Sequence, residues 1–572
     1  MAASKIRLGR WPLFLVVLLF AARSTTVSAR QHATVYFNSS ARFPFSIKIG
    51  VTDLLNGVAV GSYEPRGIQE GWNKLKVHGL NRTDAKTAAK GMGFLEGYIT
   101  QASIYNISQN NYADWFSDQE SDNHPGPVFD WLEENYEWMK GETARQLQRQ
   151  GIDGLSGSPP AAYWTTVDLL TAQFEGMMLG YNQKAPKKER LTREKFLLLN
   201  SDGDVESIVN LPSVHDALAR LNITAKAVKR KQAERCSAIW KYDSVAREIY
   251  FGHTTWDNFD MASVRQLKSY KYEFAGMKAV EVSMSSSPGF LSSVDDFYLT
   301  SNKLAVIETT NGNFNKKLWG KVTTKSVLSW VRSMVSNVLA EGTKEWTDMF
   351  CLENSGTYNN QWMVLDLEQF KEFQSDRSME HLPADTFRVL EQLPGTCATD
   401  DMTAHLESDG YWASYNIPFF YSVWKDSGFG TKTPKTYYSH DDCPRAKMFA
   451  ARNGKVADLD GVKSLLRYND FKNDPNADGN ACFGISSRCD LNPTASKSFR
   501  LEGGIDSKAT TASLAYNMIF VAQNGPTHDN QPPFNWTLWE QATAPPPGYS
   551  KLPVHTGAPE SFNFDWIGFG GH

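Results

Sequence analysis

Cys236 is a candidate nucleophile, because this cysteine directly follows a basic stretch. Residues 221–235 read LNITAKAVKRKQAER, and an apolar, strand-like run, CSAIWKY, begins at Cys236. If the peptide bond between Arg235 and Cys236 breaks, Cys236 gains a free α-amine beside its own thiol. An α-amine has a pKa of about 7.7–8.0 and a free thiol one of about 8.5, so this amine is suited to act as the general base for the sulfur.

Before such a cleavage the nitrogen of Cys236 is an amide and not a base, so the intact chain would be an inactive precursor. Residues 221–235 carry five basic residues and little apolar periodicity. They would then form an exposed propeptide segment, and a solvated helix or loop without that role is the other interpretation. For Cys236 the alternative is a buried structural cysteine, and spacing alone does not decide between the two.

Other catalytic signatures are incomplete. The run GLSGS at 154–158 lacks the last glycine of a G-x-S-x-G elbow, and no H-E-x-x-H zinc motif occurs. The run DPNADGN at 474–480 begins like a calcium loop, but its twelfth position is Ile485 where glutamate is required. The sequence therefore predicts no metal and no cofactor.

The N-terminus reads as a secretory signal. Basic residues precede the apolar run WPLFLVVLLFAA, and VSA at 27–29 provides the small residues that a signal peptidase needs, so we expect residues 1–29 to be removed. Twelve apolar residues are too few to span a bilayer, so no stable membrane anchor is expected. We expect a glycoprotein of the secretory pathway, either lysosomal or extracellular, with N-x-S/T sequons at Asn38, Asn81, Asn106, Asn222 and Asn535.

The six cysteines fit an oxidising compartment, in which they tend to pair. Cys482 and Cys489 are seven positions apart in a turn-rich stretch and are expected to form a disulfide. Cys397 with Cys443 is a second candidate pair. If Cys236 keeps its thiol, one further cysteine must also stay unpaired.

Strands and helices follow one another without βαβ alternation, which predicts an α+β fold. Strands are expected at 33–38, 45–50 and 57–64, and helices at 84–100, 127–150 and 163–181. The runs CSAIWKY and REIYFGHTTW flank a short turn and predict a β-hairpin that begins at Cys236. After it come expected strands at 278–286, 297–302, 304–311 and 361–370, and an amphipathic helix at 323–342.

Eight blocks between the hairpin and the C-terminus resemble the phospholipase B-like (lamina ancestor) proteins and occur in that family's order. They are CSAIWKYDSVAREIYFGHTTWDNF, IETTNGNFN, YWASYNIPFF, PRAKMF, LLRYNDFKNDP, ISSRCDLNP, GGIDSK and GPTHDNQPPFNW. The resemblance implies the N-terminal-nucleophile (Ntn) hydrolase fold, a four-layer αββα sandwich. It also implies self-cleavage before Cys236 into fragments of residues 30–235 and 236–572 that stay associated.

Carried over block by block, the resemblance makes Cys236 the nucleophile. His253, Asn416 and Arg445 would complete the catalytic site, with Trp256 and Thr309 lining the substrate pocket. On this basis the Cys236 thiolate attacks an acyl carbonyl, Asn416 holds the developing oxyanion, and Arg445 favours the thiolate or binds an anionic group. His253 either assists the self-cleavage or only shapes the pocket.

The family name implies hydrolysis of acyl esters of lipids, so the expected partner is a lipid or another acyl substrate. An amidase acting on N-acyl amides or small peptides is one alternative, and a processed lipid-binding glycoprotein with little turnover is another. A net charge of −4 gives no reason to expect nucleic acid. The oligomeric state is open, and a homodimer is compatible with the sequence.

Overall fold

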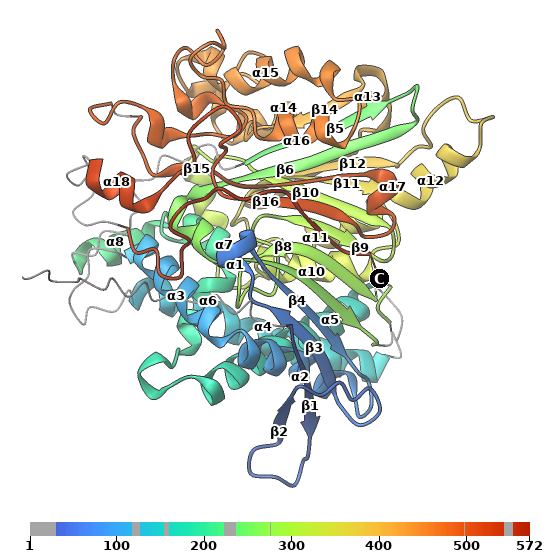
Figure 1. The fold of residues 1–572 in the computed structure, drawn as a ribbon. Coiled ribbons are helices and arrows are strands. Elements are labelled where there is room, and N and C mark those ends of the chain that lie inside the picture. The colour runs from blue at the N-terminus through green and yellow to red at the C-terminus, as the bar shows by residue number, and fades with distance from the viewer. Residues whose placement is uncertain are drawn as a thin grey trace, which may run out of the picture.

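Two β-sheets stack at the centre of the structure, and helices pack on both outer faces (Figure 1). This computed structural model describes residues 30–116, 126–153, 159–221, 236–274, 276–278, 280–496, 498–542 and 553–571. The expected signal segment 1–29 and residues 222–235 of the expected propeptide, with Asn222 and Arg235, lie outside the described residues.

The larger sheet has eleven strands: β1 (Gln31–Phe37), β2 (Phe45–Ile49), β3 (Ala59–Glu64), β4 (Trp72–Gly79), β7 (Arg265–Tyr272), β8 (Glu281–Ser286), β9 (Phe297–Thr300), β10 (Leu304–Thr310), β11 (Asn360–Asp366), β12 (Phe387–Leu393) and β13 (Thr396–Asp401). Their spatial order is β13-β12-β11-β10-β9-β8-β7-β4-β3-β1-β2. Neighbouring strands are antiparallel except β4 and β7, which run parallel. The β4–β7 pair joins the chain before residue 222 to the chain after residue 235.

The smaller sheet has six strands: β5 (Cys236–Asp243), β6 (Glu248–Asn258), β14 (Tyr411–Ser414), β15 (Glu502–Thr511), β16 (Phe520–Asn524) and β17 (Ile567–Phe569). Their order is β14-β5-β6-β15-β16-β17. The predicted hairpin is confirmed as β5 and β6, which pair in the register Cys236 with Thr255 and Ala238 with His253.

Helices form the two outer layers. Against the larger sheet lie α2 (Ala85–Ile99), α3 (Gln101–Phe116), α4 (Gly126–Asp153), α5 (Pro159–Lys184), α6 (Arg193–Asn200), α7 (Asp202–Ile208), α8 (Pro212–Arg220), α10 (Ser329–Leu339) and α11 (Thr343–Cys351). Against the smaller sheet lie α14 (Tyr421–Asp426), α15 (Pro444–Arg452) and α16 (Leu459–Leu466). Shorter or peripheral helices are α1 (Gly67–Glu70), α12 (Leu367–Ser375), α13 (Thr403–Asp409), α17 (Ala512–Ala515) and α18 (Trp536–Ala542).

The alternation of side chains along β5 explains the layers. Ala238 and Trp240 belong to a core between the two sheets, which also contains Phe297 and Ile307 of the larger sheet. Ile239 between them belongs to the core beneath α15 and α16. Successive side chains of a strand point to opposite faces, so one strand contributes to both cores. The expected α+β class is thereby confirmed.

Two element boundaries differ from those expected. The helix expected from Thr323 begins only at Ser329, because Val327 forms a β-bridge with Asn354. The strand expected over 361–370 ends at Asp366, whose side chain accepts hydrogen bonds from the backbone N–H groups of Glu368 and Gln369 and so starts α12.

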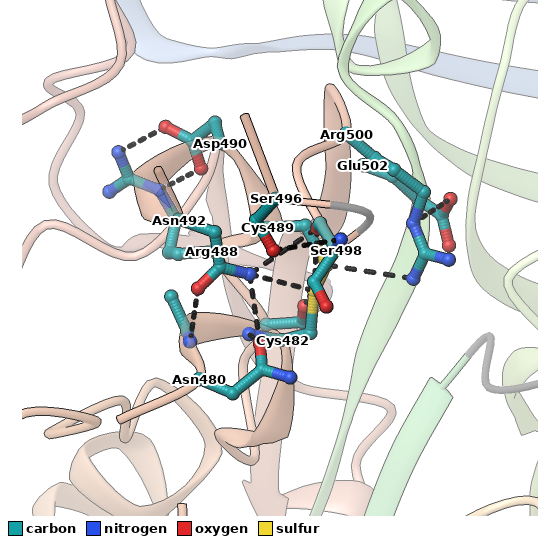
Figure 2. Close-up of a disulfide and its surroundings, with 12 residues drawn as sticks. Asn480, Cys482, Arg488, Cys489, Asp490, Asn492, Ser496, Ser498, Arg500 and Glu502 are labelled. Carbon is teal, nitrogen blue, oxygen red and sulfur yellow. Dashed lines mark hydrogen bonds and ion pairs between the residues drawn. A yellow bond between two sulfur atoms is a disulfide. The ribbon is translucent and has the colours of Figure 1, made fainter. Parts of the chain in front are cut away.

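Four of the six cysteines form disulfides. The expected Cys482–Cys489 bond is present, in a loop that Asn492 ties together through Asn480 and the carbonyl of Ser498 (Figure 2). The candidate pair of Cys397 with Cys443 was wrong, because Cys397 is bonded to Cys351 at the end of α11. Cys236 and Cys443 keep their thiols, and both are buried.

A buried ion pair crosses between the two parts of the chain. Lys268 on β7 donates to a carboxylate oxygen of Glu96 on α2 at 2.7 Å, and both side chains are fully buried. The hydroxyl of Tyr270 donates to the other oxygen at 2.5 Å. Removing one partner of such a pair leaves an uncompensated buried charge, so it locks α2 against the later strands.

Helices α2 and α5 approach so closely that only glycine fits at their crossing. A Cβ at Gly97 would lie 2.1 Å from the carbonyl oxygen of Met177, and one at Gly180 would lie 2.0 Å from that of Phe94. Gly93 and Gly176 make equivalent contacts. The two helices therefore pack backbone to backbone.

We predict that Gly97→Ala lowers the free energy of unfolding by about 3 kcal/mol, because the added methyl group must push the two helices apart. Gly141→Ala is the matched control. Gly141 lies in α4 with no atom within 4 Å of an added Cβ, so this variant should gain about 1 kcal/mol from helix propensity. Urea unfolding followed by circular dichroism measures both. Equal stability of the two variants would contradict the close packing.

Candidate active site

Cys236 is the first residue of β5, a strand that lies between β14 and β6 in the smaller sheet. Its side chain is on the same face of the strand as Ala238 and Trp240, which puts the thiol on the side of the larger sheet. The residue is 3% exposed. The backbone pairing of Cys236 with Thr255 on β6 fixes its position.

His253 and Glu308 approach this thiol. The Cys236 sulfur, an imidazole nitrogen of His253 and a carboxylate oxygen of Glu308 all lie within 4.8 Å of one another, and the three residues are buried. Burial lowers the pKa of His253 well below its ordinary value, and the charge of Lys508 lowers it further, while the backbone of Glu308 acts in the opposite direction. His253 is therefore neutral near pH 7 and able to accept a proton.

Arg445 at the start of α15 connects the nucleophile strand to the Asn416 loop. Its Nη1 donates to the carbonyl oxygen of Cys236 at 2.6 Å and to Ser237 Oγ at 3.2 Å. Its Nη2 donates to the carbonyl oxygen of Tyr415 at 2.8 Å and to Asn416 Oδ1 at 2.7 Å. These bonds hold the guanidinium in place, so Arg445 acts here as a positioning residue.

Asn416 is held from both ends of its side chain. Its Oδ1 accepts from Arg445, and its Nδ2 donates to the carbonyl oxygen of Thr310 at 2.6 Å. Its backbone has a φ of +71°, in the left-handed region that asparagine tolerates better than most residues. An amide nitrogen carries two donors, so one N–H remains beyond the bond to Thr310.

Thr309 and Trp256 support this arrangement from two sides. Thr309 is fully buried, and its Oγ1 lies 2.6 Å from the Oγ of Ser414, two residues before Asn416. Arg445 stacks over the ring of Trp256 at 4.4 Å, and Trp256 Nε1 donates to the carbonyl oxygen of Ile485. Ile485 belongs to the loop closed by the Cys482–Cys489 disulfide, so that loop positions Trp256.

A small cavity adjoins Cys236. Its free volume is about 20 Å³, which is enough for a water molecule. Trp256 and Tyr358 contribute to its wall, and the charged residues that line it are Asp202, Asp257, Asp295 and Arg265. Asp202 comes from α7, so the chain before residue 222 forms part of this wall. The charged lining is predominantly acidic.

A second, aromatic pocket lies on the other side of Arg445 and Asn416. Its lining includes Cys443, which is the other free thiol besides Cys236, and the residues Phe314, Tyr415, Ile417, Phe429, Tyr437, Tyr438 and Phe483. Arg445 and Asn416 line it as well. The pocket offers an apolar surface next to the residues that hold Cys236.

The sequence did not reveal the buried charges around this site. Lys508 donates to Thr255 Oγ1 at 2.5 Å and to Asp506 at 2.6 Å, and Arg265 pairs with Asp295 and Asp506. All are at most 4% exposed. They come from β7, from β15 and from the segment directly before β9, which are far apart in the sequence. Glu308 lies in the block IETTNGNFN, directly before Thr309, but the sequence analysis did not single it out.

The expected sequons differ in exposure. Asn38 and Asn81 are exposed, whereas Asn106 and Asn535 are half-buried. The side chain of Asn106, on α3, packs against Gly557. Glycosylation at all five positions remains a prediction. Among the described helices, none has both the length and the apolar composition needed to cross a membrane.

Comparison with known proteins identifies the family. A family model for Phospholipase B matches residues 59–569. Phospholipase B-like protein B of Dictyostelium discoideum is 32% identical, covering 90% of this chain and 85% of its own length. Phospholipase B-like 1 of Rattus norvegicus is 31% identical, covering 97% of this chain and 96% of its own length. The chain therefore belongs to the phospholipase B family, which confirms the resemblance.

A buried glutamate holds the loop that follows Asn416. Glu391 on β12 accepts hydrogen bonds from the backbone N–H groups of Phe419 and Phe420 at 2.7 and 3.1 Å. Burial raises the pKa of Glu391 from 4.5 to about 7, although these hydrogen bonds oppose the shift. In the unfolded chain the same carboxyl group ionises near its ordinary pKa, so Glu391 stabilises the fold below that pKa and loses this contribution as pH rises through about 7.

We predict that the melting temperature of the protein falls between pH 4.5 and 7, and that Glu391→Gln falls less steeply. At about 1.4 kcal/mol per pH unit, the contribution of this group over that range is about 3 kcal/mol. Asp400→Asn, at an exposed position on β13, is the control and should keep the wild-type slope. Differential scanning fluorimetry across the range measures the slopes. A Gln variant as steep as the wild type would contradict this role.

Proposed function

We propose that this protein is a self-processing hydrolase that cleaves acyl esters of glycerophospholipids through an N-terminal cysteine, Cys236. The observation that carries the proposal is the position of Cys236. Its thiol starts a strand beside neutral His253, and its carbonyl is bonded to the same arginine that holds Asn416. The order of helix, sheet, sheet and helix layers is the one expected of Ntn hydrolases, and we assign the fold to that class.

In the first step the Cys236 sulfur attacks the carbonyl carbon of Arg235. The sulfur–carbon bond forms as the peptide C–N bond breaks, and His253 transfers the thiol proton to the departing nitrogen, which becomes the α-amine of Cys236. Water then hydrolyses the thioester, which leaves a carboxylate on Arg235 and restores the thiol. The buried imidazole of His253 is suited to this transfer because it starts uncharged.

During turnover the new α-amine of Cys236 replaces His253 as the group that accepts the thiol proton. The α-amine takes the proton from the Cys236 thiol, the sulfur attacks the ester carbonyl, and the alcohol leaves with that proton. The remaining N–H of Asn416 stabilises the oxyanion. One such donor contributes roughly 2.7–4 kcal/mol to transition-state binding in comparable sites. Water hydrolyses the resulting thioester, and the cavity beside Cys236 has room for that water.

The aromatic pocket beside Asn416 and Arg445 supports an acyl substrate, because an apolar chain gains free energy when it leaves water. Trp256 separates this pocket from the acidic cavity through its stacking on Arg445. Since Arg445 is already bonded to four acceptors, we assign it no contact with an anionic substrate group.

The two products of self-cleavage would remain one molecule. The β4–β7 pairing and the Lys268–Glu96 ion pair join the parts of the chain on either side of residues 222–235. Asp202, from the earlier part, lines the cavity at Cys236. We therefore propose that the earlier fragment is a structural part of the active site.

We place the protein in the secretory pathway, in a lysosome or outside the cell. An acidic compartment is favoured by two buried carboxyl groups, because burial raises the pKa of Asp204 to about 6 and that of Glu391 to about 7. Both groups stabilise the fold most below their ordinary pKa values, and this stabilisation is lost as pH rises through 6 and 7.

Cys236→Ala is predicted to accumulate as one uncleaved chain without hydrolase activity, because it lacks the sulfur that forms the thioester in the proposed mechanism. Cys443→Ala is the matched control, since Cys443 is the other buried thiol, and it should be cleaved normally. Denaturing gel electrophoresis shows whether each variant has been cleaved into two fragments. Release of fatty acid from phosphatidylcholine at pH 5, with N-acyl amides and small peptides in parallel, reads turnover.

Two fragments from the Cys236→Ala variant would rule out self-cleavage by this thiol. If the cleaved wild-type protein released acyl groups only from amides, the ester specificity would be wrong and the mechanism would stand. If it released none from any substrate, the protein would be a lipid-binding glycoprotein and not an enzyme.

A further inference from the structure

The three groups that converge at Cys236 have the donor atoms of a transition-metal site. A thiolate sulfur, an imidazole nitrogen and a carboxylate oxygen are the ligands that Zn²⁺ takes in proteins, and three protein ligands plus water is the usual set of an open zinc site. Here one such atom each from Cys236, His253 and Glu308 lies within 4.8 Å of the other two. To form zinc bonds of about 2.0–2.3 Å, these three ligand atoms need to move only slightly closer to one another.

A second observation points to a ligand at the same place. His253 is fully buried, yet its Nε2 makes no hydrogen bond of good geometry among the described residues, and the backbone of Glu308 acts on the ring only weakly against the effect of burial. Its Nδ1 lies 3.4 Å from Thr255 Oγ1. Buried polar atoms are nearly always hydrogen-bonded, so an exception in a native structure calls for an explanation such as an unseen water or ion.

The surrounding charge favours a cation. Asp295, Asp296, Glu308 and Asp506 are all buried around the site, and Asp296 is close enough to Glu308 for a side-chain hydrogen bond. Arg265 and Lys508 supply the positive charges that pair with Asp295 and Asp506. A hydrogen bond between two carboxyl groups needs one proton, so Asp296 and Glu308 together carry one negative charge. With Asp295 and Asp506 the site then has three negative charges against two positive ones, and a divalent ion would offset the excess.

A small acidic cavity adjoins the site. The cavity beside Cys236 is lined by Asp202, Asp257 and Asp295 against a single cation, Arg265. An acidic lining raises the local concentration of cations. The same cavity has room for the water that would complete the metal's coordination.

We propose that Cys236, His253 and Glu308 bind Zn²⁺, and that the bound ion reversibly blocks the nucleophile. Cys236 would bind as a thiolate, and its proton would pass to solvent. The sulfur lone pair would then be engaged by the metal and unable to attack a carbonyl, so both self-cleavage and turnover would stop until the metal is removed. In the cleaved protein the α-amine of Cys236 adds a donor. This addition and the block of self-cleavage and turnover rest on the proposed function, whereas metal binding itself does not.

Co²⁺ is the probe, because a cobalt–thiolate bond gives a charge-transfer band in the near ultraviolet that needs no turnover. Titration of the full-length protein with CoCl₂ should produce this band, and ZnCl₂ should remove it by displacement. Cys236→Ser should abolish the band. His253→Gln and Glu308→Gln should each weaken Co²⁺ binding more than about tenfold, since loss of even an outer-shell partner often costs 10–100-fold.

Cys443→Ser is the matched control and should keep the band, because Cys443 lies in the aromatic pocket away from His253 and Glu308. Absence of the band in the wild type, or its persistence in Cys236→Ser, would overturn the proposal. So would unchanged affinity in both the His253 and Glu308 variants, provided that circular dichroism shows them folded. If those variants do not fold, protection of Cys236 from iodoacetamide by Zn²⁺ in the wild-type protein, read by mass spectrometry, decides the question: unprotected alkylation overturns the site.

Discussion

The site depends on one side chain, the guanidinium of Arg445. It bonds to the carbonyl oxygen of Cys236 on β5, to the carbonyl of Tyr415 and to the amide oxygen of Asn416, while its plane stacks on Trp256. A planar group with donors in a fixed fork can hold three chain segments in one geometry, which a lysine cannot do. The nucleophile and the oxyanion donor of the proposed mechanism are thereby placed relative to each other before any substrate arrives.

Several residues around Arg445 have energetically unfavourable conformations or environments. Asn416 has a left-handed backbone, His253 is buried with an unsatisfied nitrogen, and Lys508 and Asp506 are charged in the interior. Each costs free energy that the surrounding sheets must supply. Such local exceptions collect at functional sites because reactivity there requires them. His253 and the Lys508–Asp506 pair lie outside the pocket that Cys443 lines, and this distinguishes the surroundings of the two buried thiols.

The sequence predicted the elements with regular patterns and missed what depends on three-dimensional proximity. The hairpin from Cys236 was predictable because two apolar runs flank a short turn, and the Cys482–Cys489 bond because the two residues are close in sequence. The Cys351–Cys397 bond spans 46 residues and joins α11 to β13, so no local signal marks it. Asn416 and Arg445 were found through the family blocks alone, since neither stands at a spacing that suggests chemistry. Glu308 and Lys508 were not found, because the sheets bring them to the site from distant strands.

In the proposed mechanism, breaking one peptide bond creates the catalytic group. The N-terminal sequence of the larger fragment of purified wild-type protein, determined by Edman degradation or mass spectrometry, tests it most directly. We expect a fragment that begins Cys-Ser-Ala-Ile-Trp, with Cys236 carrying an unblocked α-amine. A single uncut chain of full activity, or an active fragment whose first residue is any other, would contradict it.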